Sequence, residues 1–194
     1  NVGVGYQAGA AATTGSDNVL IGDRAGQALT TGSSNVGIGK MAMYSQTTAT
    51  GNTALGRDAL KANVTGAGNT ALGYQVLENS TAGNNTGAGY NAIQANTSGE
   101  YLTAFGYRAL DSNTTASFND AFGYFALTAN TTGTGNAAFG TSALDASTTG
   151  NYNTALGGAA LGSNTTASFN TAVGYQSGLA NTTGNLTAFG YQAG

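Results

Sequence analysis

The sequence predicts an all-β fold, a β-solenoid (β-roll) of about 11 to 12 coils with a 17-residue repeat and two short strands in each coil. Three observations predict it. A core related to Asn69-Thr70-Ala71-Leu72-Gly73 recurs along the whole chain, in steps of 17 residues with two exceptions of 16. The fifth position of the core is always glycine, and a turn rich in asparagine, threonine and glycine follows. Residues 1–194 therefore form a single repeat array.

The spacing of the cores also defines where the array is irregular. Copies begin at residues 1, 18, 35, 52, 69, 85, 102, 119, 136, 153, 170 and 186. The two shorter units lose a residue beside Gly83 and Gly184, in a turn, where a solenoid tolerates deletion. The chain starts and stops inside a repeat and has no initiating methionine, so we expect it to be a fragment of a longer chain.

The glycine of each core is expected to have a structural role. Its recurrence in register predicts a positive φ or a place with no room for a Cβ atom. The twelve positions are Gly5, Gly22, Gly39, Gly56, Gly73, Gly89, Gly106, Gly123, Gly140, Gly157, Gly174 and Gly190.

The residues before this glycine predict the first strand of each coil. The position just before it is apolar in every copy, and the one before that is alanine or glycine in all but one. Because neighbouring strand residues face opposite ways, one face carries large apolar side chains and the other carries small ones. We expect the large ones to stack in one buried column that includes Leu72, Phe105, Phe122 and Phe139. The small face allows close approach of either the opposite wall of the coil or a neighbouring chain.

A second apolar pair, as in Ala109-Leu110 and Ala126-Leu127, predicts the second strand. The turn that follows, for example Asn130-Thr131-Thr132-Gly133, supplies side-chain hydrogen bonds and left-handed backbone. Since equivalent residues lie above one another in a solenoid, ladders of asparagine and of threonine are expected.

Composition narrows the possible functions. Only 7% of residues are charged and the formal net charge is -3, so no basic stripe for nucleic acid is expected. Histidine and cysteine are absent, and the eight carboxylates occupy different phases of the repeat. We therefore predict no enzyme, no metal site and no cofactor. No apolar run approaches the length of a membrane helix, which predicts no membrane insertion.

Two repeated features are candidate binding surfaces. A tyrosine follows the core glycine in seven units, namely Tyr6, Tyr74, Tyr90, Tyr107, Tyr124, Tyr175 and Tyr191. Stacked aromatic rings with polar tips suit sugar or protein surfaces, although they could equally shield a coil edge or a chain interface. Pairs such as Thr131-Thr132 could order water as ice-binding proteins do, but their asparagine and glycine neighbours favour turn chemistry.

The units Asn69 to Leu77 and Leu186 to Gly194 closely resemble repeats of phage and prophage tail-fibre proteins, of the kind found upstream of endosialidase-type intramolecular chaperone domains. Asn18-Val-Leu-Ile-Gly22 and Asn35-Val-Gly-Ile-Gly39 are similar to the head repeats of trimeric autotransporter adhesins, although the unit here is longer. Both resemblances imply left-handed β-rolls assembled as trimers or filaments in an extracellular appendage of a virion or cell, where the partner is a cell-surface glycan or protein receptor. The expected function is therefore a structural and adhesive fibre segment; the alternative is a monomeric solenoid that binds a ligand or ice through its threonine or tyrosine ladders.

Overall fold

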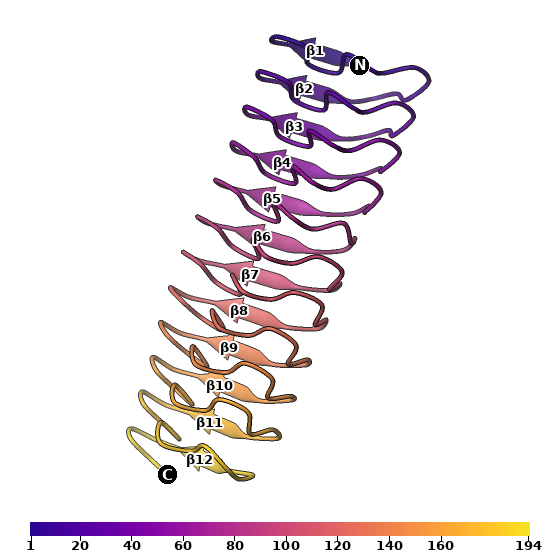
Figure 1. Ribbon diagram of the computed structural model, residues 1–194. Coiled ribbons are helices and arrows are strands. Elements are labelled where there is room, and N and C mark those ends of the chain that lie inside the picture. Colours follow the sequence, from indigo (N-terminus) through magenta and orange to yellow (C-terminus); the bar gives the residue numbers. More distant parts are fainter.

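The structure is a computed structural model that describes residues 1–194. Twelve parallel strands, one in each coil, form a single sheet in which the order along the sheet is the order along the chain. Figure 1 shows the resulting stack of coils, with the two ends of the chain at opposite ends of the rod. The strands are β1 (Val2–Val4), β2 (Val19–Ile21), β3 (Val36–Ile38), β4 (Thr53–Leu55), β5 (Thr70–Leu72), β6 (Thr86–Ala88), β7 (Thr103–Phe105), β8 (Asp120–Phe122), β9 (Ala137–Phe139), β10 (Thr154–Leu156), β11 (Thr171–Val173) and β12 (Thr187–Phe189).

Strand pairing places equivalent positions of the repeat side by side. Ala104 pairs with Ala121, and Phe105 pairs with Phe122. The 16-residue units keep the same register, since Thr70 lies opposite Thr86. The 16-residue units therefore lack a residue outside the strands. The predicted β-solenoid with its 17-residue repeat is confirmed.

Each strand ends at the core glycine, for two reasons that act together. The φ of Gly106 is +141°, a conformation that side chains disfavour. A Cβ atom there would lie only 2.7 Å from the carbonyl carbon of Gly123 in the next coil. Both properties that the sequence suggested as alternatives are present at this position.

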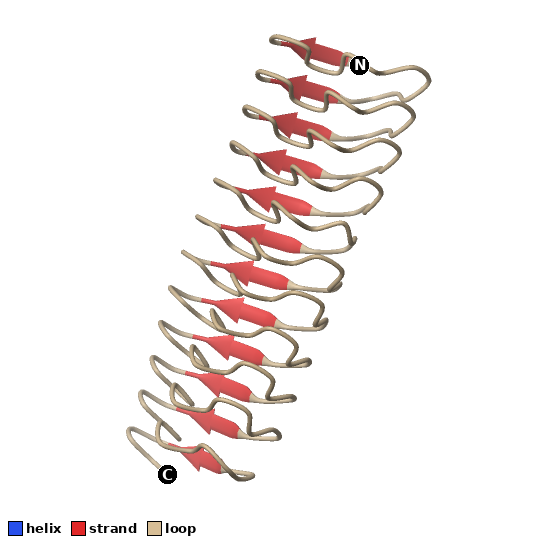
Figure 2. Ribbon diagram, in the orientation of Figure 1, coloured by secondary structure: helices blue, strands red, loops and turns tan.

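The wall opposite the sheet consists of consecutive turns, so the prediction of two strands per coil is wrong. Figure 2 shows a single strand in each coil, followed by loop. After β8, the N–H of Ala126 donates to the carbonyl of Gly123, and the N–H of Asn130 donates to that of Leu127. Ala126 and Leu127 are both completely buried, whereas neighbouring residues of a strand face opposite sides. A positive φ of 52° at Leu127 turns its side chain inward. We call this wall the turn wall.

Hydrogen bonds between coils offset the strain of these positive φ values. A non-glycine residue in this region costs about 1–2 kcal/mol. The N–H of Leu127 donates to the carbonyl of Ala143 in the next coil, and the N–H of Phe125 donates to that of Tyr107 in the preceding one. Each such bond contributes about 1 kcal/mol. The turn wall is therefore stable only as part of the stack.

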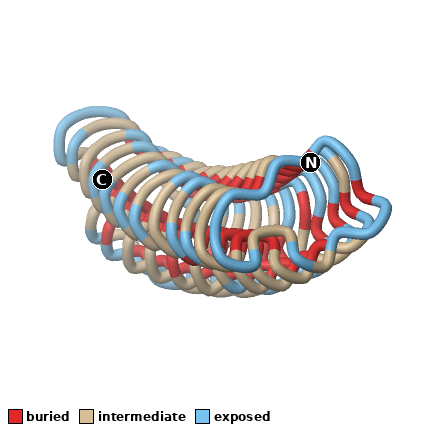
Figure 3. Tube along the Cα trace, turned by 90° about the horizontal axis from the view of Figure 1, so that it is seen from above, coloured by how far each residue is buried: buried red, intermediate tan, exposed pale blue.

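The core lies between the small side chains of the strands and the apolar pairs of the turn wall. Ala104, Ala121 and Ala138 face inward and are fully buried, opposite Leu110, Leu127 and Leu144. In the view along the rod, buried segments recur at the same places in successive coils (Figure 3). The small face of the strand is thus covered by the chain's own turn wall and not by a neighbouring chain.

The prediction that the large apolar residues of the strands form a buried column is wrong, because these side chains point away from the interior. Leu72, Phe105 and Phe139 point outward and are 37%, 40% and 37% exposed, while Phe122 is half-buried. The predicted stacking is present, since the ring centroids of Phe105 and Phe122 are 5.1 Å apart. The leucines of the turn wall already fill the interior, and only alanine or glycine fits opposite them.

Asparagine ladders complete the interior. The buried Asn136 side chain accepts a bond from the N–H of Asn153 through Oδ1 (3.0 Å) and donates from Nδ2 to the carbonyl of Gly150 (2.8 Å). A second ladder closes the turns: Asn63 donates to the carbonyl of Gly66 and accepts from its N–H. These bonds satisfy backbone groups that would otherwise be buried without partners. The predicted asparagine ladders are confirmed.

Candidate functional site

The twelve core glycines form a row at the end of the sheet, where φ lies between 121° and 144°. For all but the last, a Cβ atom would collide with the backbone of the next coil. They allow the coils to approach and expose no side chain of their own. The role of these glycines is structural, and any binding surface is formed by the side chains of the residues around them.

The tyrosines that follow these glycines lie at the surface and divide into groups. Tyr74, Tyr90, Tyr107 and Tyr124 occupy four successive coils, with ring centroids 5.1, 5.3 and 5.3 Å apart. Six of the seven tyrosines are exposed, and Tyr74 is half-buried. Tyr175 stacks on Tyr191, whereas Tyr6 has no aromatic neighbour in the row, and Thr141 and Gly158 interrupt it. We call the four consecutive rings the tyrosine row.

Stacking limits what the tyrosine row can bind. The interplanar angles of 9°, 11° and 16° show that each ring covers the face of the next. At one end, the guanidinium carbon of Arg57 lies 5.8 Å from the centre of the Tyr74 ring. The inner rings therefore present their edges and phenol groups, because their faces are covered. Such a row can form hydrogen bonds to sugars or polypeptides, but only its free end can stack on a sugar ring.

The outer face of the sheet carries a row of large apolar side chains at the third strand position, beside a row that is mostly threonine at the first. Phe105, Phe122 and Phe139 stack along it at 5.1 and 4.7 Å. Val4, Leu55, Leu156 and Phe189 extend this row toward both ends and are all exposed. This row consists of the third residue of each strand. Sheets in which all strands are parallel normally have both faces covered, so an exposed apolar face of this kind is unusual.

A second aromatic row, which the sequence analysis missed, borders the same face. It consists of the residue just before each core, and Tyr101, Phe118, Tyr152 and Phe169 are its exposed aromatic members. Tyr101 stacks on Phe118 at 5.1 Å, and Tyr152 stacks on Phe169 at 5.5 Å. We call this set the corner row. It could have been found in the sequence, because aromatic residues recur there at the repeat spacing.

The threonine pairs take part in turn chemistry. The first hydroxyl of a pair donates to the backbone carbonyl of the equivalent residue in the next coil, as Thr131 does to Thr148 at 3.1 Å. The same bond joins Thr114 to Thr131 and Thr148 to Thr165. These hydroxyls therefore bond backbone carbonyls within the turns, as the turn interpretation predicts, and the ice-binding alternative stays a prediction.

Charged side chains on the turn wall are paired along the rod. Asp58 lies 3.2 Å from Arg57 and 3.5 Å from Lys61, and Lys61 lies 3.4 Å from Glu78. Burial lowers the pKa of Lys61, but Asp58 and Glu78 outweigh it and the net shift is upward. A hydrogen bond of 2.7 Å to Asp111 likewise raises the pKa of Arg108. The pair of Lys61 and Glu78 joins two coils, the other pairs lie within one coil, and together they leave little free charge on this part of the wall.

No three side chains of metal-binding type come together in the molecule. The structure holds no helix that is long and apolar enough to cross a lipid bilayer. Comparisons of the chain with protein-family models, with curated proteins and with solved structures give no match.

Proposed function

We propose that this chain is a structural and adhesive segment of an extracellular fibre, carried by a virion or a cell surface, and that it has no enzymatic activity. The coils give length and stiffness, because each is bonded to its neighbours through the sheet, the turn wall and the asparagine ladders. Near-identical coils repeat the same surface many times. That arrangement suits weak multivalent contact better than one precise pocket.

The observation that carries the proposal is the exposed apolar outer face of the sheet. In the coil of β7, Tyr101, Phe105 and Tyr107 all point outward from this wall. Eleven steps of about 4.8 Å give this face a length of roughly 53 Å, and seven extended residues give it a width of roughly 20 Å. The resulting area of roughly 1,000 Å² exceeds the ~800 Å² that each partner buries in a typical stable interface.

Two further copies of the same chain, parallel and in register, are the occupants we infer for this face. A second copy has the same rise per coil, so a contact that forms at one coil is repeated at all the other coils. A partner with another period would match at one place only. A rotation axis along the rod closes such an assembly as a trimer, and the same copies could continue in a longer filament.

The tyrosine row is the surface that we propose for attachment. Its rings recur every 5.1–5.3 Å along four coils, and each carries a hydroxyl group, which suits a repeating glycan or an extended protein segment of a cell-surface receptor. A contact with a single hydroxyl is weak, and several in a row add through multivalency.

The assembly can be tested by mass measurement in solution. We expect a trimer by analytical ultracentrifugation for the natural chain. We expect a monomer with an unchanged far-ultraviolet spectrum for Leu156→Lys, because no carboxylate lies in the paired strands beside that position and the lysine would be buried without a partner at the interface. Thr128→Lys adds the same charge on the turn wall and should remain a trimer.

A monomeric natural chain would overturn the proposed assembly, and a trimeric Leu156→Lys would show that another face is used. Thermal hysteresis on the same samples tests the ice-binding alternative. A monomer that shows hysteresis would favour that alternative over the fibre.

A further inference from the structure

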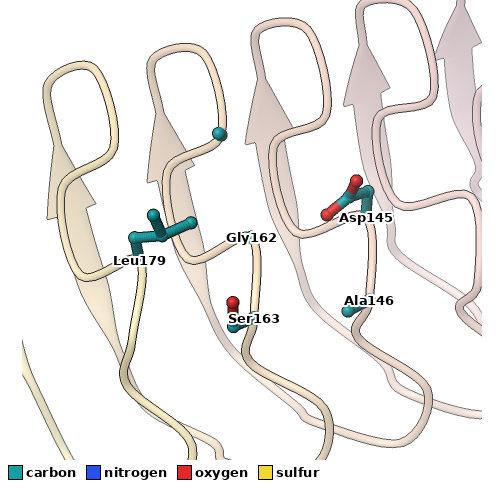
Figure 4. Close-up of a pocket in the computed structure, with 6 residues that line it drawn as sticks. Asp145, Ala146, Gly162, Ser163 and Leu179 are labelled. Atoms are coloured by element: carbon teal, nitrogen blue, oxygen red, sulfur yellow. The ribbon is translucent and has the colours of Figure 1, made fainter.

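A notch interrupts the turn wall near the C-terminal end of the rod. It has a volume of about 600 Å³ and is lined by Asp145, Ala146, Ala159, Gly162, Ser163 and Leu179. Figure 4 shows that Asp145 and Leu179, from coils on either side, both extend toward Gly162. A Cβ atom on Gly162 would lie 3.1 Å from Leu179 Cδ1 and 3.5 Å from Asp145 Oδ1. Gly162 thus forms the floor of the notch, and the Leu179 and Asp145 side chains approach each other over it.

The same position in neighbouring coils shows what the notch lacks. In successive coils, this row of the turn wall holds Lys61, Glu78, Gln94, Asp111, Thr128, Asp145, Gly162 and Leu179. Glu78 has a donor on each side, with Lys61 Nζ at 3.4 Å in the preceding coil and Gln94 Nε2 at 2.8 Å in the following coil. Asp111, in the same row, is paired instead with Arg108 of its own coil. Each of these carboxylates thus has a nitrogen donor from a side chain nearby.

Asp145 has no such donor. Thr128 and Gly162 are its neighbours in the row, and neither carries a charge. The other carboxylates of the turn wall (Asp58, Glu78 and Asp111) all form ion pairs within the chain, and Asp145 forms none. Burial raises the pKa of the Asp145 carboxyl, although a hydrogen bond from Ser142 opposes the shift. A cation that entered the notch would compensate the free energy that this burial costs.

The walls of the notch also fit a particular kind of cation. The Leu179 methyl groups and Ala159 form an apolar side opposite the Asp145 carboxylate. Lysine and arginine combine a charged end with an apolar stem, and they bury the stem along apolar surface. A hydrated inorganic ion would gain no favourable contact from the apolar side of the notch.

We propose that this notch binds a single lysine or arginine side chain of a partner polypeptide, with the charged group on Asp145 and the stem against Leu179. The bound cation would occupy the place that Gln94 occupies beside Glu78. The notch lies on the turn wall, away from the outer face of the sheet, so the proposal does not depend on whether the chain forms a trimer.

Titration of the full chain with Nα-acetyl-lysine N-methylamide tests the proposal. The readout is the set of NMR signals of the Leu179 methyl groups and the Gly162 and Ser163 amides. We expect saturable shifts at probe concentrations up to about 200 mM, because an exposed ion pair with a short apolar contact gives weak affinity, with a Kd on the order of tens of millimolar. The norleucine analogue has the same stem without the charge and should give no saturable shift.

Two variants complete the test. Asp145→Asn should weaken binding of the lysine probe by about 10-fold or more, because a charge-assisted hydrogen bond is lost. Gly162→Lys should abolish binding by placing the chain's own cation in the notch. Gly162 does not have a positive φ, and the new Cβ atom requires only a small shift of the Leu179 side chain, so the variant should fold, which an unchanged far-ultraviolet spectrum would show.

Equal affinity in Asp145→Asn, or equal shifts with the norleucine analogue, would overturn the assignment of a cation site. The absence of shifts at all three residues would overturn the site itself. These results leave the test of fibre assembly untouched, because that test measures mass and uses a different face.

Discussion

At the scale of single residues, the backbone depends on positions that only certain side chains tolerate. Glycine is required where φ is positive and the next coil leaves no space, as at Gly106. Elsewhere the chain accepts leucine or phenylalanine at a positive φ, as at Leu110 and Phe125, because inter-coil hydrogen bonds hold those turns. The two kinds of position therefore respond differently to substitution.

Gly106→Ala is expected to lower the free energy of unfolding by several kcal/mol, since the new Cβ atom combines backbone strain with collision against Gly123. Gly184→Ala is the matched control, because a Cβ atom there has no neighbour within 4 Å. Thermal or urea unfolding of the two variants measures the difference. Equal losses of stability would show that the core glycines are not constrained in this way.

Asp145→Asn is expected to stabilise the chain at pH 7 by less than about 1 kcal/mol, given its partial exposure. Burial raises the pKa of this carboxyl in the folded state. Its unfavourable effect is therefore absent below the pKa of the unfolded chain and develops as the pH rises through the folded value. The melting temperatures of variant and natural chain should converge near pH 3. Glu100→Gln, at an exposed position, is the control and should show no such trend.

At the scale of elements, the ladders join coils that have little core of their own. Each coil contributes a few buried apolar side chains, such as Ala121, Ala126 and Leu127, and the remaining interior is filled by asparagine. The second ladder has a defect. Asn130 Oδ1 and Ser147 Oγ are both buried and neither has a hydrogen-bond partner. The serine is too short to continue the ladder from Asn130.

Ser147→Asn is expected to raise the free energy of unfolding by about 1 kcal/mol, because its amide would donate to Asn130 Oδ1. The same bond already joins Asn130 to Asn113 at 3.1 Å. The reverse change in the same ladder, Asn164→Ser, should be destabilising, since Asn164 forms two bonds with Ala167. Urea unfolding checks both. A loss of stability in Ser147→Asn would contradict the ladder explanation.

At the scale of the whole molecule, stability is a sum over coils and the interfaces between them. No strand is unique, since β2 to β11 each pair with two neighbours in the same register. The charged residues are less evenly distributed, and two separate groups of ion pairs, Arg57 to Glu78 and Arg108 with Asp111, lie on the middle coils. The rod should therefore tolerate the loss of a whole coil but not of part of one.

Deletion of residues 119–135, one complete unit, is expected to preserve folding and to shorten the rod by about 4.8 Å. Attachment to target cells should fall little, because the deletion removes only Tyr124 from the tyrosine row and leaves Tyr74, Tyr90 and Tyr107 stacked. X-ray scattering gives the length, and cell binding is measured on the same sample. Deletion of residues 119–126 breaks the register and should prevent folding. If the complete deletion kept the rod but lost attachment, this segment would contain a discrete site and the fibre hypothesis would fail.

Much of the candidate surface could be predicted from periodicity. Tyr90 and Tyr107 share a phase of the repeat, and parallel in-register pairing then places them one coil apart, as the structure shows. The corner row containing Phe118 and the notch at Gly162 were not predicted. The notch is formed by residues of three successive coils, with Gly162 between Asp145 and Leu179. It can be recognised only when the positions of these three coils in space are known.

The sequence by itself determined the coil, its length and the register, because a fixed period places equivalent residues above one another. It did not determine which face of the strand is inside. Both faces are apolar at Ala121 and Phe122, so alternation alone cannot choose between them. The tertiary structure decides, because Leu127 enters the interior from the opposite wall and leaves space only for alanine. The Phe122 side chain therefore points outward and contributes to the apolar row on the outer face of the single chain.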